Sequence, residues 1–165
     1  MEAHAQSPHP MELALEEARK ALSRGEVPVG AVLMHDGQVI ASAGNEREAS
    51  CDPTAHAEIL CLQRGARKLG RWHLEDCQLY VTLEPCPMCA GALGLARLGH
   101  VVYGAPDIQK GCCGSVYDLL YDRKLRTCTS WQGGEMEQAC RALLDGFFAM
   151  RRQGIRRESS QEADS

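Results

Sequence analysis

The chain has 165 residues, of which 44% are hydrophobic and 24% charged, and this is the composition of a soluble globular protein with one domain. No apolar run has the length of a membrane span or the character of a signal peptide, so we expect a cytoplasmic protein without a membrane partner. Nine cysteines in such a protein indicate reduced thiols and metal ligands and argue against a disulfide framework.

The net charge of -4 argues against general affinity for nucleic acid, but the charge is unevenly distributed. Residues 1–60 carry ten acidic and four basic side chains, whereas two later stretches are basic. These stretches contain Arg64, Arg67, Lys68 and Arg71, and Arg141, Arg151, Arg152, Arg156 and Arg157. They can bind a polyanion or form ordinary solvated helix faces, and charge alone does not decide between the two.

Helix and strand patterns alternate along the chain. In order they are a helix over 11–24, strands over 27–34 and 38–43, a helix over 54–69, a strand over 77–83, a helix over 87–98, a strand over 101–103, a short helix over 115–120, a strand over 127–131 and a helix over 135–152. We expect residues 1–10 to be a flexible N-terminal extension, residues 11–157 one domain and residues 158–165 a disordered acidic tail. The alternation predicts an α/β fold with a mixed sheet between two layers of helices.

Two short motifs lie at the beginnings of predicted helices. His-Ala-Glu over residues 56–58 lies in the first turn of one helix, and Pro-Cys-Pro-Met-Cys over residues 85–89 runs from a strand into the next. Cys86 and Cys89 are three residues apart, so both thiols reach one side of a helical turn, and Pro87 suits the first helical position. Two thiolates and one imidazole form a ligand set that suits zinc.

The positions of His56 and Glu58 restrict where a shared site can lie. On a regular helix two residues so spaced point about 200° away from each other. They serve one site only if it lies beyond the N-terminal end of the helix, where the positive end of the helix dipole also favours thiolates. We therefore expect one ion between two helix N-termini.

Three protein ligands leave the fourth position of a tetrahedral zinc ion to water, which is the arrangement of catalytic sites. Zinc lowers the pKa of this water to about 7, and Glu58, which is not needed as a ligand, can shuttle its protons. In the alternative, Cys112 or Cys113 is a fourth ligand and the zinc is structural. That alternative leaves Glu58 beside the metal without a role.

The combined pattern H-x-E and P-C-x-x-C is the signature of zinc-dependent nucleobase deaminases in the cytidine and deoxycytidylate deaminase superfamily. From about Met11 to Arg152 the chain resembles the bacterial tRNA wobble adenosine deaminases. The resemblance includes residues 26–32, Asn45, and residues 52–58, 79–86, 89–92, 111–115 and 147–152. Pro106 departs from it, because many relatives carry a polar or basic residue there, and the N-terminal extension has no counterpart.

The resemblance implies a cytidine-deaminase-like three-layer αβα fold with a central five-stranded mixed sheet, a homodimer, and the anticodon stem-loop of an arginine tRNA as substrate. The reaction it implies is hydrolysis of the wobble adenosine to inosine by a zinc-activated water. His56, Cys86 and Cys89 would hold one Zn²⁺, and Glu58 would be the catalytic proton shuttle. The implied substrate-binding residues are Asn45, Ala57, Asp107, Lys110, Phe147, Phe148 and Arg151.

The outer residues have structural alternatives. Asn45 follows a glycine and can simply form a turn. Phe147 and Phe148 lie on or near the apolar stripe of their helix, so we expect at least one of them in the core. Arg151 continues that stripe, whereas Arg152 is turned about 100° away, so Arg151 either faces RNA or forms a salt bridge within the fold.

Two other functions compete with tRNA deamination. A deaminase of a free base such as guanine or cytosine can carry the same zinc motif, although the basic C-terminal helix argues against it. A catalytically silent RNA-binding subunit can keep the fold and zinc as a scaffold, although Glu58 is the residue that such a protein would lose first. Ammonia release from an anticodon stem-loop, compared with free bases, separates these functions.

Overall fold

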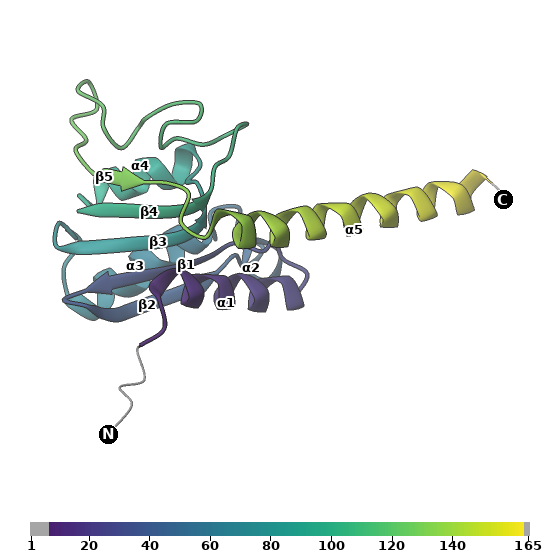
Figure 1. Cartoon of the computed structure of the whole chain (residues 1–165), viewed down its shortest axis with the longest axis horizontal. Helices are drawn as coiled ribbons and strands as arrows, with labels where there is room; N and C mark the ends of the chain where they lie inside the picture. Colours follow the sequence, from purple (N-terminus) through teal and green to yellow (C-terminus); the bar gives the residue numbers. More distant parts are fainter. Residues whose placement is uncertain (1–6, 164–165) are drawn as a thin grey trace.

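A five-stranded sheet with the strand order β2-β1-β3-β4-β5 runs through the centre of the computed structural model, which describes residues 7–163 and the side chains up to Ile155 (Figure 1). The strands are β1 (Gly30–His35), β2 (Gln38–Gly44), β3 (Cys77–Leu83), β4 (His100–Ala105) and β5 (Ser130–Gln132). β1 pairs with β2 and β3 in antiparallel orientation, whereas β3, β4 and β5 are parallel. The predicted five-stranded mixed sheet is thus confirmed.

Helices cover both faces of this sheet. α1 (Pro10–Ser23) and α5 (Glu137–Ala163) pack on one face, α3 (Ala57–Leu69) and α4 (Pro87–Leu95) on the other, and the short α2 (Arg47–Ser50) connects β2 to α3. The C-terminal part of α5 projects beyond the sheet (Figure 1, yellow). The fold therefore has the expected three layers.

Each face of the sheet has its own hydrophobic core. Cys61 of α3 and Leu93 of α4 belong to the same buried cluster as Leu79 of β3. On the opposite face Leu15 of α1 and Leu144 of α5 form a second cluster with neighbouring strand residues. Because burial of one such side chain contributes about 1.5–3 kcal/mol, the two clusters fix the helices against the sheet.

The ends of the strands place two helix N-termini together. β3 and β4 are parallel, so their C-terminal ends lie at one edge of the sheet. α4 begins four residues after the end of β3, and α3 begins on the same side, next to α4. The helix N-termini that the sequence predicts around an ion are therefore neighbours.

Most predicted elements differ from the structure in their bounds, and three of these differences have a clear cause in the backbone. The first strand begins at Gly30, because the N–H of Val29 bonds to the carbonyl of Val27 in a tight turn and not to a neighbouring strand. α4 ends at Leu95, since Arg97 has a φ of 53° and turns the chain. The predicted helix over 115–120 is wrong: the N–H groups of Val116 and Tyr117 bond to the carbonyl of Gly111.

The N-terminal segment is partly attached to the domain. Residues 1–6 lie outside the described residues, but His9 caps α1, and its N–H donates to the carboxylate of Glu12 at 3.1 Å. The His9 ring also packs edge-on against Tyr80 of β3, with 5.9 Å between ring centroids.

At the other end, α5 continues to Ala163 and so includes residues 158–163, where the sequence predicts a disordered tail. The division of the chain at residues 10 and 157 itself stays a prediction. Within residues 7–163, each helix is too short or too polar to cross a membrane.

Candidate metal centre and active site

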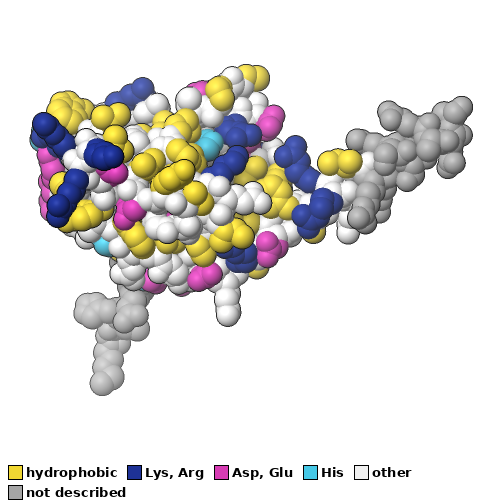
Figure 2. Space-filling model, turned by 90° about the horizontal axis from the view of Figure 1, so that it is seen from above, with side chains coloured by type: hydrophobic (Ala, Val, Ile, Leu, Met, Phe, Trp, Pro, Cys, Tyr) yellow, Lys and Arg dark blue, Asp and Glu magenta, His cyan; other side chains and the backbone are white. Residues whose placement is uncertain are grey.

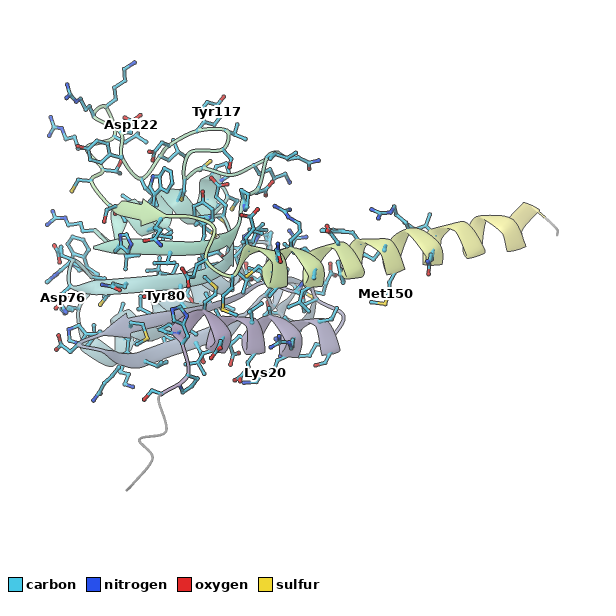
Figure 3. The ribbon with its side chains drawn as sticks, in the orientation of Figure 1. Lys20, Asp76, Tyr80, Tyr117, Asp122 and Met150 are labelled. Carbon is cyan, nitrogen blue, oxygen red and sulfur yellow. The ribbon has the colours of Figure 1, made fainter. Side chains whose placement is uncertain are left out.

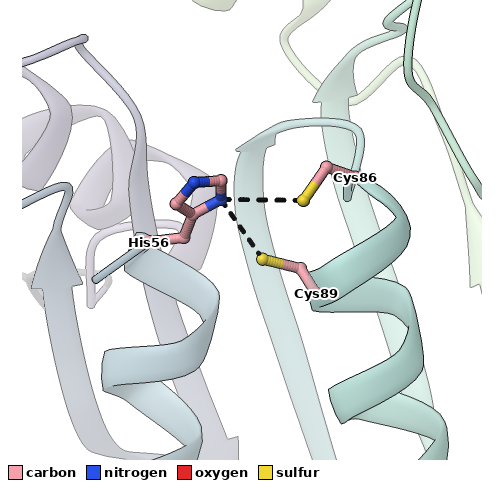
Figure 4. Close-up of side chains that lie close together, drawn as sticks. All are labelled: His56, Cys86 and Cys89. Atoms are coloured by element: carbon pink, nitrogen blue, oxygen red, sulfur yellow. Dashed lines mark hydrogen bonds between the residues drawn. The ribbon is translucent and has the colours of Figure 1, made fainter. Parts of the chain in front are cut away.

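α3 and α4 run side by side and begin at the same end, where the side chains at their N-terminal ends face one another (Figure 4). His56 is the N-cap residue of α3 and Cys86 the N-cap residue of α4, and Cys89 lies in the first turn of α4. Both caps have extended backbone conformations, which direct their side chains beyond the helix ends. His56 therefore reaches a site beyond the N-terminal end of its helix, which is where the spacing of His56 and Glu58 requires a shared site to lie.

The distances between the three side chains fit one metal ion. His56 Nδ1 lies 3.6 Å from Cys86 Sγ and 3.5 Å from Cys89 Sγ, and the three ligand atoms all lie within 4.8 Å of one another. Zn–N and Zn–S bonds of about 2.05 and 2.3 Å at a tetrahedral angle require an N–S separation of about 3.6 Å. The group can therefore hold a metal ion, and its donor atoms and separations fit zinc.

The alternative fourth ligands lie elsewhere. Neither Cys112 nor Cys113 belongs to the His-Cys-Cys group formed by the described residues. The thiol of Cys112 donates to the carbonyl of Lys110 at 3.5 Å, and both cysteines are buried in the core. Three protein ligands remain, as in a site that leaves one position to water.

The surroundings of Cys86 favour a thiolate. Hydrogen bonds from the Cys89 thiol and from the His56 ring lower the pKa of Cys86 to about 4, against the opposing effect of burial. The helix N-terminus at Cys86 acts in the same direction. One of the two thiols is therefore deprotonated at neutral pH, which is the form that binds a metal.

Glu58 lies beside this group but is not part of it. Its side chain is 4% exposed, and it lines the same cavity as His56 and Cys86. Burial, reinforced by the negative charge of Cys86, raises the pKa of Glu58 to about 7. A carboxyl group with such a pKa can accept and return a proton near neutral pH.

A cavity of about 190 Å³ lies in front of the metal-binding group. Besides His56, Glu58 and Cys86, it is lined by four residues that the sequence singled out, Asn45, Ala57, Asp107 and Lys110. Asn45 is 6% exposed, and its Oδ1 has no hydrogen-bond partner among the described residues. Because an unpartnered buried oxygen is costly, Asn45 fits a ligand-binding role better than a turn-forming one.

A groove adjoins the cavity and shares Val27, Leu83, Asp107 and Lys110 with it. Its other lining residues come from the loop after β4 and from α5, and they are Ile108, Gln109, Arg141, Leu144, Asp145, Phe148 and Arg152. Figure 2 shows Lys and Arg side chains next to hydrophobic ones where α5 leaves the body. The metal-binding group therefore lies at the end of a partly basic, partly apolar path.

The residues predicted on α5 take separate positions. Phe148 is 43% exposed and lines the groove, whereas Phe147 is buried, which confirms that at least one of them packs in the fold. The guanidinium of Arg151 lies over the Phe147 ring, 5.4 Å from its centroid, and is outside the groove. Among the residues with described side chains, Arg151 forms no ion pair.

Arg152 lines the groove although the sequence favoured Arg151. Arg152 follows Phe148 by four residues, so the two side chains share one helix face, and this spacing is a signal that the sequence contains. Arg47 and Glu84, which also line the cavity, were missed as well. Pro106 is connected to the groove lining, because its carbonyl accepts a hydrogen bond from the guanidinium of Arg141.

Two arginines of the first basic stretch form ion pairs within the fold. Arg64 forms an ion pair with Glu46 at 3.0 Å, and Arg71 forms one with Asp76 at 2.6 Å. Neither arginine lines the cavity or the groove. For these two residues the structure supports the alternative of an ordinary helix surface.

Comparison with known proteins leads to the same chemistry. A family model described as MafB19-like deaminase matches residues 6–152. The tRNA-specific adenosine deaminase of Bacillus subtilis is 46% identical, over 84% of this chain and 86% of the relative. A structure from a study of A-to-I editing by tRNA:A34 deaminases has a TM-score of 0.80 and 43% identity, covering 82% of this chain and 99% of that one. A guanine deaminase from Nitrosomonas europaea has a TM-score of 0.73 and 25% identity, covering 85% and 83%.

The fold and the site together define a hydrolytic deaminase with a His-Cys-Cys metal-binding group. Guanine deaminase and tRNA deaminase structures share this fold, but the similarity in sequence is much greater on the tRNA side. The chain belongs to the family of the tRNA-specific adenosine deaminases.

Proposed function

We propose that this protein converts the wobble adenosine in the anticodon loop of a tRNA, with an arginine tRNA as the expected substrate, to inosine and ammonia. The observation that carries this proposal is the continuity between the cavity and the groove. A free base needs the cavity alone, whereas a nucleotide within RNA needs a path for its neighbours. Lys110, Arg141 and Arg152 border that path with positive charge, and Phe148 offers an aromatic face on which a base can stack.

Zinc is the metal that we assign to His56, Cys86 and Cys89, because soft thiolates, an imidazole and tetrahedral separations suit it. When bound, it supplies Lewis-acid chemistry, which makes hydroxide available from water near pH 7. A chelator that strips the metal should abolish activity, and added zinc should restore it.

Glu58 moves the protons of the proposed reaction. Its carboxylate accepts the proton released by the attacking water and delivers it to N1 of adenine as oxygen adds to C6. It then carries the second proton to the amino nitrogen, which leaves as ammonia. The burial of Glu58 keeps bulk water from competing for these protons. The position of Asn45 at the cavity wall suits a hydrogen bond from the inserted nucleotide to its unpartnered Oδ1.

The anticodon loop suits this arrangement, since its bases are unpaired before they bind. Extrusion of such a base costs a few kcal/mol at most. The role of Asp107 and Lys110 is to contact the nucleotides on either side of the adenosine, because both residues line the cavity as well as the groove. From the proposed tRNA substrate we infer that the enzyme is cytoplasmic.

We also propose that the protein is a homodimer. Each residue of α4 from Pro87 to Leu95 is uncharged, and an apolar helix of this kind is normally buried. In the single chain Leu95 is 80% exposed and Tyr121 is 67% exposed. Tyr117, in the loop after β4, is 66% exposed (Figure 3). A second copy would cover this surface. Leu95→Glu should shift the molar mass measured by light scattering from that of a dimer to that of a monomer.

The decisive experiment compares substrates under single-turnover conditions. An anticodon stem-loop with adenosine at the wobble position should release ammonia and yield inosine, whereas free guanine, cytosine and adenosine should not react at a comparable rate. A stem-loop with guanosine at that position is the matched control. Rapid deamination of free guanine with an inert stem-loop would establish the free-base alternative.

A further inference from the structure

Glu84 is a buried carboxylate that the proposed chemistry does not use. It lies between β3 and α4, two residues before Cys86, and its side chain is 1% exposed. Its Oε1 accepts hydrogen bonds from the N–H groups of Cys113 at 2.9 Å and Ser115 at 3.1 Å. Its Oε2 accepts from the N–H of Asp107 at 2.9 Å and from the hydroxyl of Ser115. Both carboxylate oxygens thus have two donors each.

All of these donors belong to the segment 107–115, which follows β4. Two backbone hydrogen bonds also join the turn before α4 to the chain at and after the end of β4. The N–H of Glu84 donates to the carbonyl of Ala105, and the N–H of Cys112 donates to the carbonyl of Pro85, each at 2.9 Å. Charge-assisted hydrogen bonds to a buried carboxylate are among the stronger ones in proteins. Segment 107–115 is therefore attached to the turn that carries Cys86, although some 25 residues separate them in sequence.

Gly111 shows how close this contact is. A Cβ atom at position 111 would lie 2.3 Å from the Glu84 carboxyl group and 2.5 Å from the carbonyl oxygen of Asp107. Neither atom can move away without breaking the bonds described above. The segment packs directly on the carboxylate, and a side chain other than hydrogen does not fit there.

Segment 107–115 forms the wall between the cavity and the groove. Asp107 and Lys110 line both, and Ile108 is 83% exposed beside them. The Asp107 carboxylate closes the turn by accepting from the N–H groups of Gln109 and Lys110 at 3.0 and 3.1 Å. The wall is therefore rigid in itself, and Glu84 fixes its distance from the metal-binding group.

We propose that Glu84 is a positioning residue for RNA recognition: through segment 107–115 it holds the groove wall in register with the metal-binding group. This inference rests on the proposed function, because it takes RNA as the occupant of the groove. Loss of the carboxylate should weaken binding of the nucleotides that flank the adenosine and leave the chemical step largely unchanged.

The test uses a graded set of variants in the full-length, zinc-loaded protein. Glu84→Ala removes every acceptor, whereas the amide of Glu84→Gln keeps the bonds from Cys113 and Ser115 and leaves the Asp107 N–H without an acceptor. Gly111→Ala displaces the segment without changing Glu84. Leu98→Ala, which removes a core side chain that is 2% exposed and lies after α4, is the control for a general loss of stability.

Two measurements are needed for each variant. Hydrogen exchange of the amides in segment 107–115 should accelerate by about tenfold or more in Glu84→Ala and by less in Glu84→Gln. With the anticodon stem-loop, KM should rise by about 10- to 100-fold in Glu84→Ala and Gly111→Ala, with kcat within about threefold of the wild type. Leu98→Ala should lower the melting temperature but leave both KM and segment exchange unchanged.

A merely structural role gives a different result. If Glu84→Ala lowers the melting temperature and the active fraction while KM stays at its wild-type value, the proposal is overturned. Unchanged exchange in segment 107–115 overturns it as well. If Glu84→Ala does not fold, Gly111→Ala and Glu84→Gln decide by the same criteria. A wild-type protein that is inert on the stem-loop would refute the proposed function itself, and that result is distinct from any of these.

Discussion

His56 Nδ1 lies 3.5 Å from Cys89 Sγ, although the two residues begin different helices and are 33 positions apart. The separation equals the edge of a tetrahedron around a zinc ion to within about 0.1 Å. Both helices are fixed on the same face of the sheet by one core. The fold therefore brings the two ligands together from distant parts of the chain.

The His56, Cys86 and Cys89 group should contain one zinc ion per chain. His56→Ala and Cys86→Ser should each lose the metal, because a site with three protein ligands rarely tolerates the loss of one. Cys128→Ser, which changes an exposed cysteine outside the group, is the control and should keep it. The check is elemental analysis of freshly purified protein, and wild-type protein without zinc would contradict the assignment.

Glu58→Gln should separate chemistry from binding. The variant should keep zinc and stem-loop affinity but lose about 10²- to 10⁴-fold in single-turnover rate, or roughly 3 to 5 kcal/mol of barrier, because the amide cannot carry protons. Glu48→Gln, at an exposed position on α2, should react like the wild type. A Glu58→Gln rate within tenfold of the wild type would exclude Glu58 as the shuttle.

Asn45→Ala should reduce activity without reducing stability. The Oδ1 of Asn45 has no partner among the described residues, so its removal breaks no hydrogen bond of that oxygen within the fold. We expect the melting temperature to change by no more than about 2 °C and kcat/KM on the stem-loop to fall by about tenfold or more, as for loss of a hydrogen bond to substrate. A large drop in melting temperature would show that Asn45 is a structural residue.

Arg152 and Arg151 should differ in their contribution to RNA binding. Arg152 lines the groove, so Arg152→Glu should weaken stem-loop binding and reduce the slope of log K against log salt by about 0.7 to 0.9 for each lost phosphate contact. Arg151→Glu removes a cation–π contact with Phe147, worth about 0.5–1 kcal/mol at an exposed site, and should affect stability more than the slope. Binding titrations of both variants at two salt concentrations test this. Equal slopes of log K against log salt for the two variants would contradict the placement of Arg152, and not Arg151, in the groove.

The ion pair between Arg71 and Asp76 should make a small, pH-dependent contribution to stability. The hydrogen bond from Arg71 lowers the pKa of Asp76 to about 2, with a smaller contribution from His35. Since the folded pKa lies below the unfolded one, the contribution is present above about pH 4 and is lost as the pH falls toward 2. The Asp76 side chain is 50% exposed and lies at the end of the sheet away from α5 (Figure 3), so screening keeps it below about 1 kcal/mol. Melting curves of wild type and Asp76→Asn should converge at low pH, and a constant difference would refute this explanation.

The parts that sequence predicts well are those that depend on neighbours in the chain. β3 has its predicted bounds, Cys77–Leu83, because its alternating side chains signal a strand directly. Cys86 and Cys89 lie together because three residues span one helical turn. The lining of the groove was harder to predict, because the face that α5 turns toward the body depends on packing against distant strands. Arg152, and not Arg151, lines the groove for this reason.

Segment 107–115 shows the same limit more strongly. Three of its N–H groups bond to Glu84, some 20 to 30 residues earlier. No sequence pattern near the segment predicts that partner. The helix predicted over 115–120 is absent for a local reason, because the N–H groups of Val116 and Tyr117 bond to the carbonyl of Gly111 and that of Leu119 bonds to the carbonyl of Cys112. Long-range polar contacts of buried side chains are therefore the main part of the site that sequence reasoning misses.

The neighbouring N-termini of α3 and α4 have a consequence for how this fold diversifies. The residues that can hold a metal come from two helix beginnings, whereas the rest of the lining of the cavity and the groove includes residues of α2, segment 107–115 and α5. A lineage can exchange those outer parts and so acquire a new substrate without disturbing the reactive centre. This chain and a guanine deaminase share one architecture at 25% identity, and an arrangement with the metal-binding residues on one part of the chain and the outer lining on others accommodates such divergence.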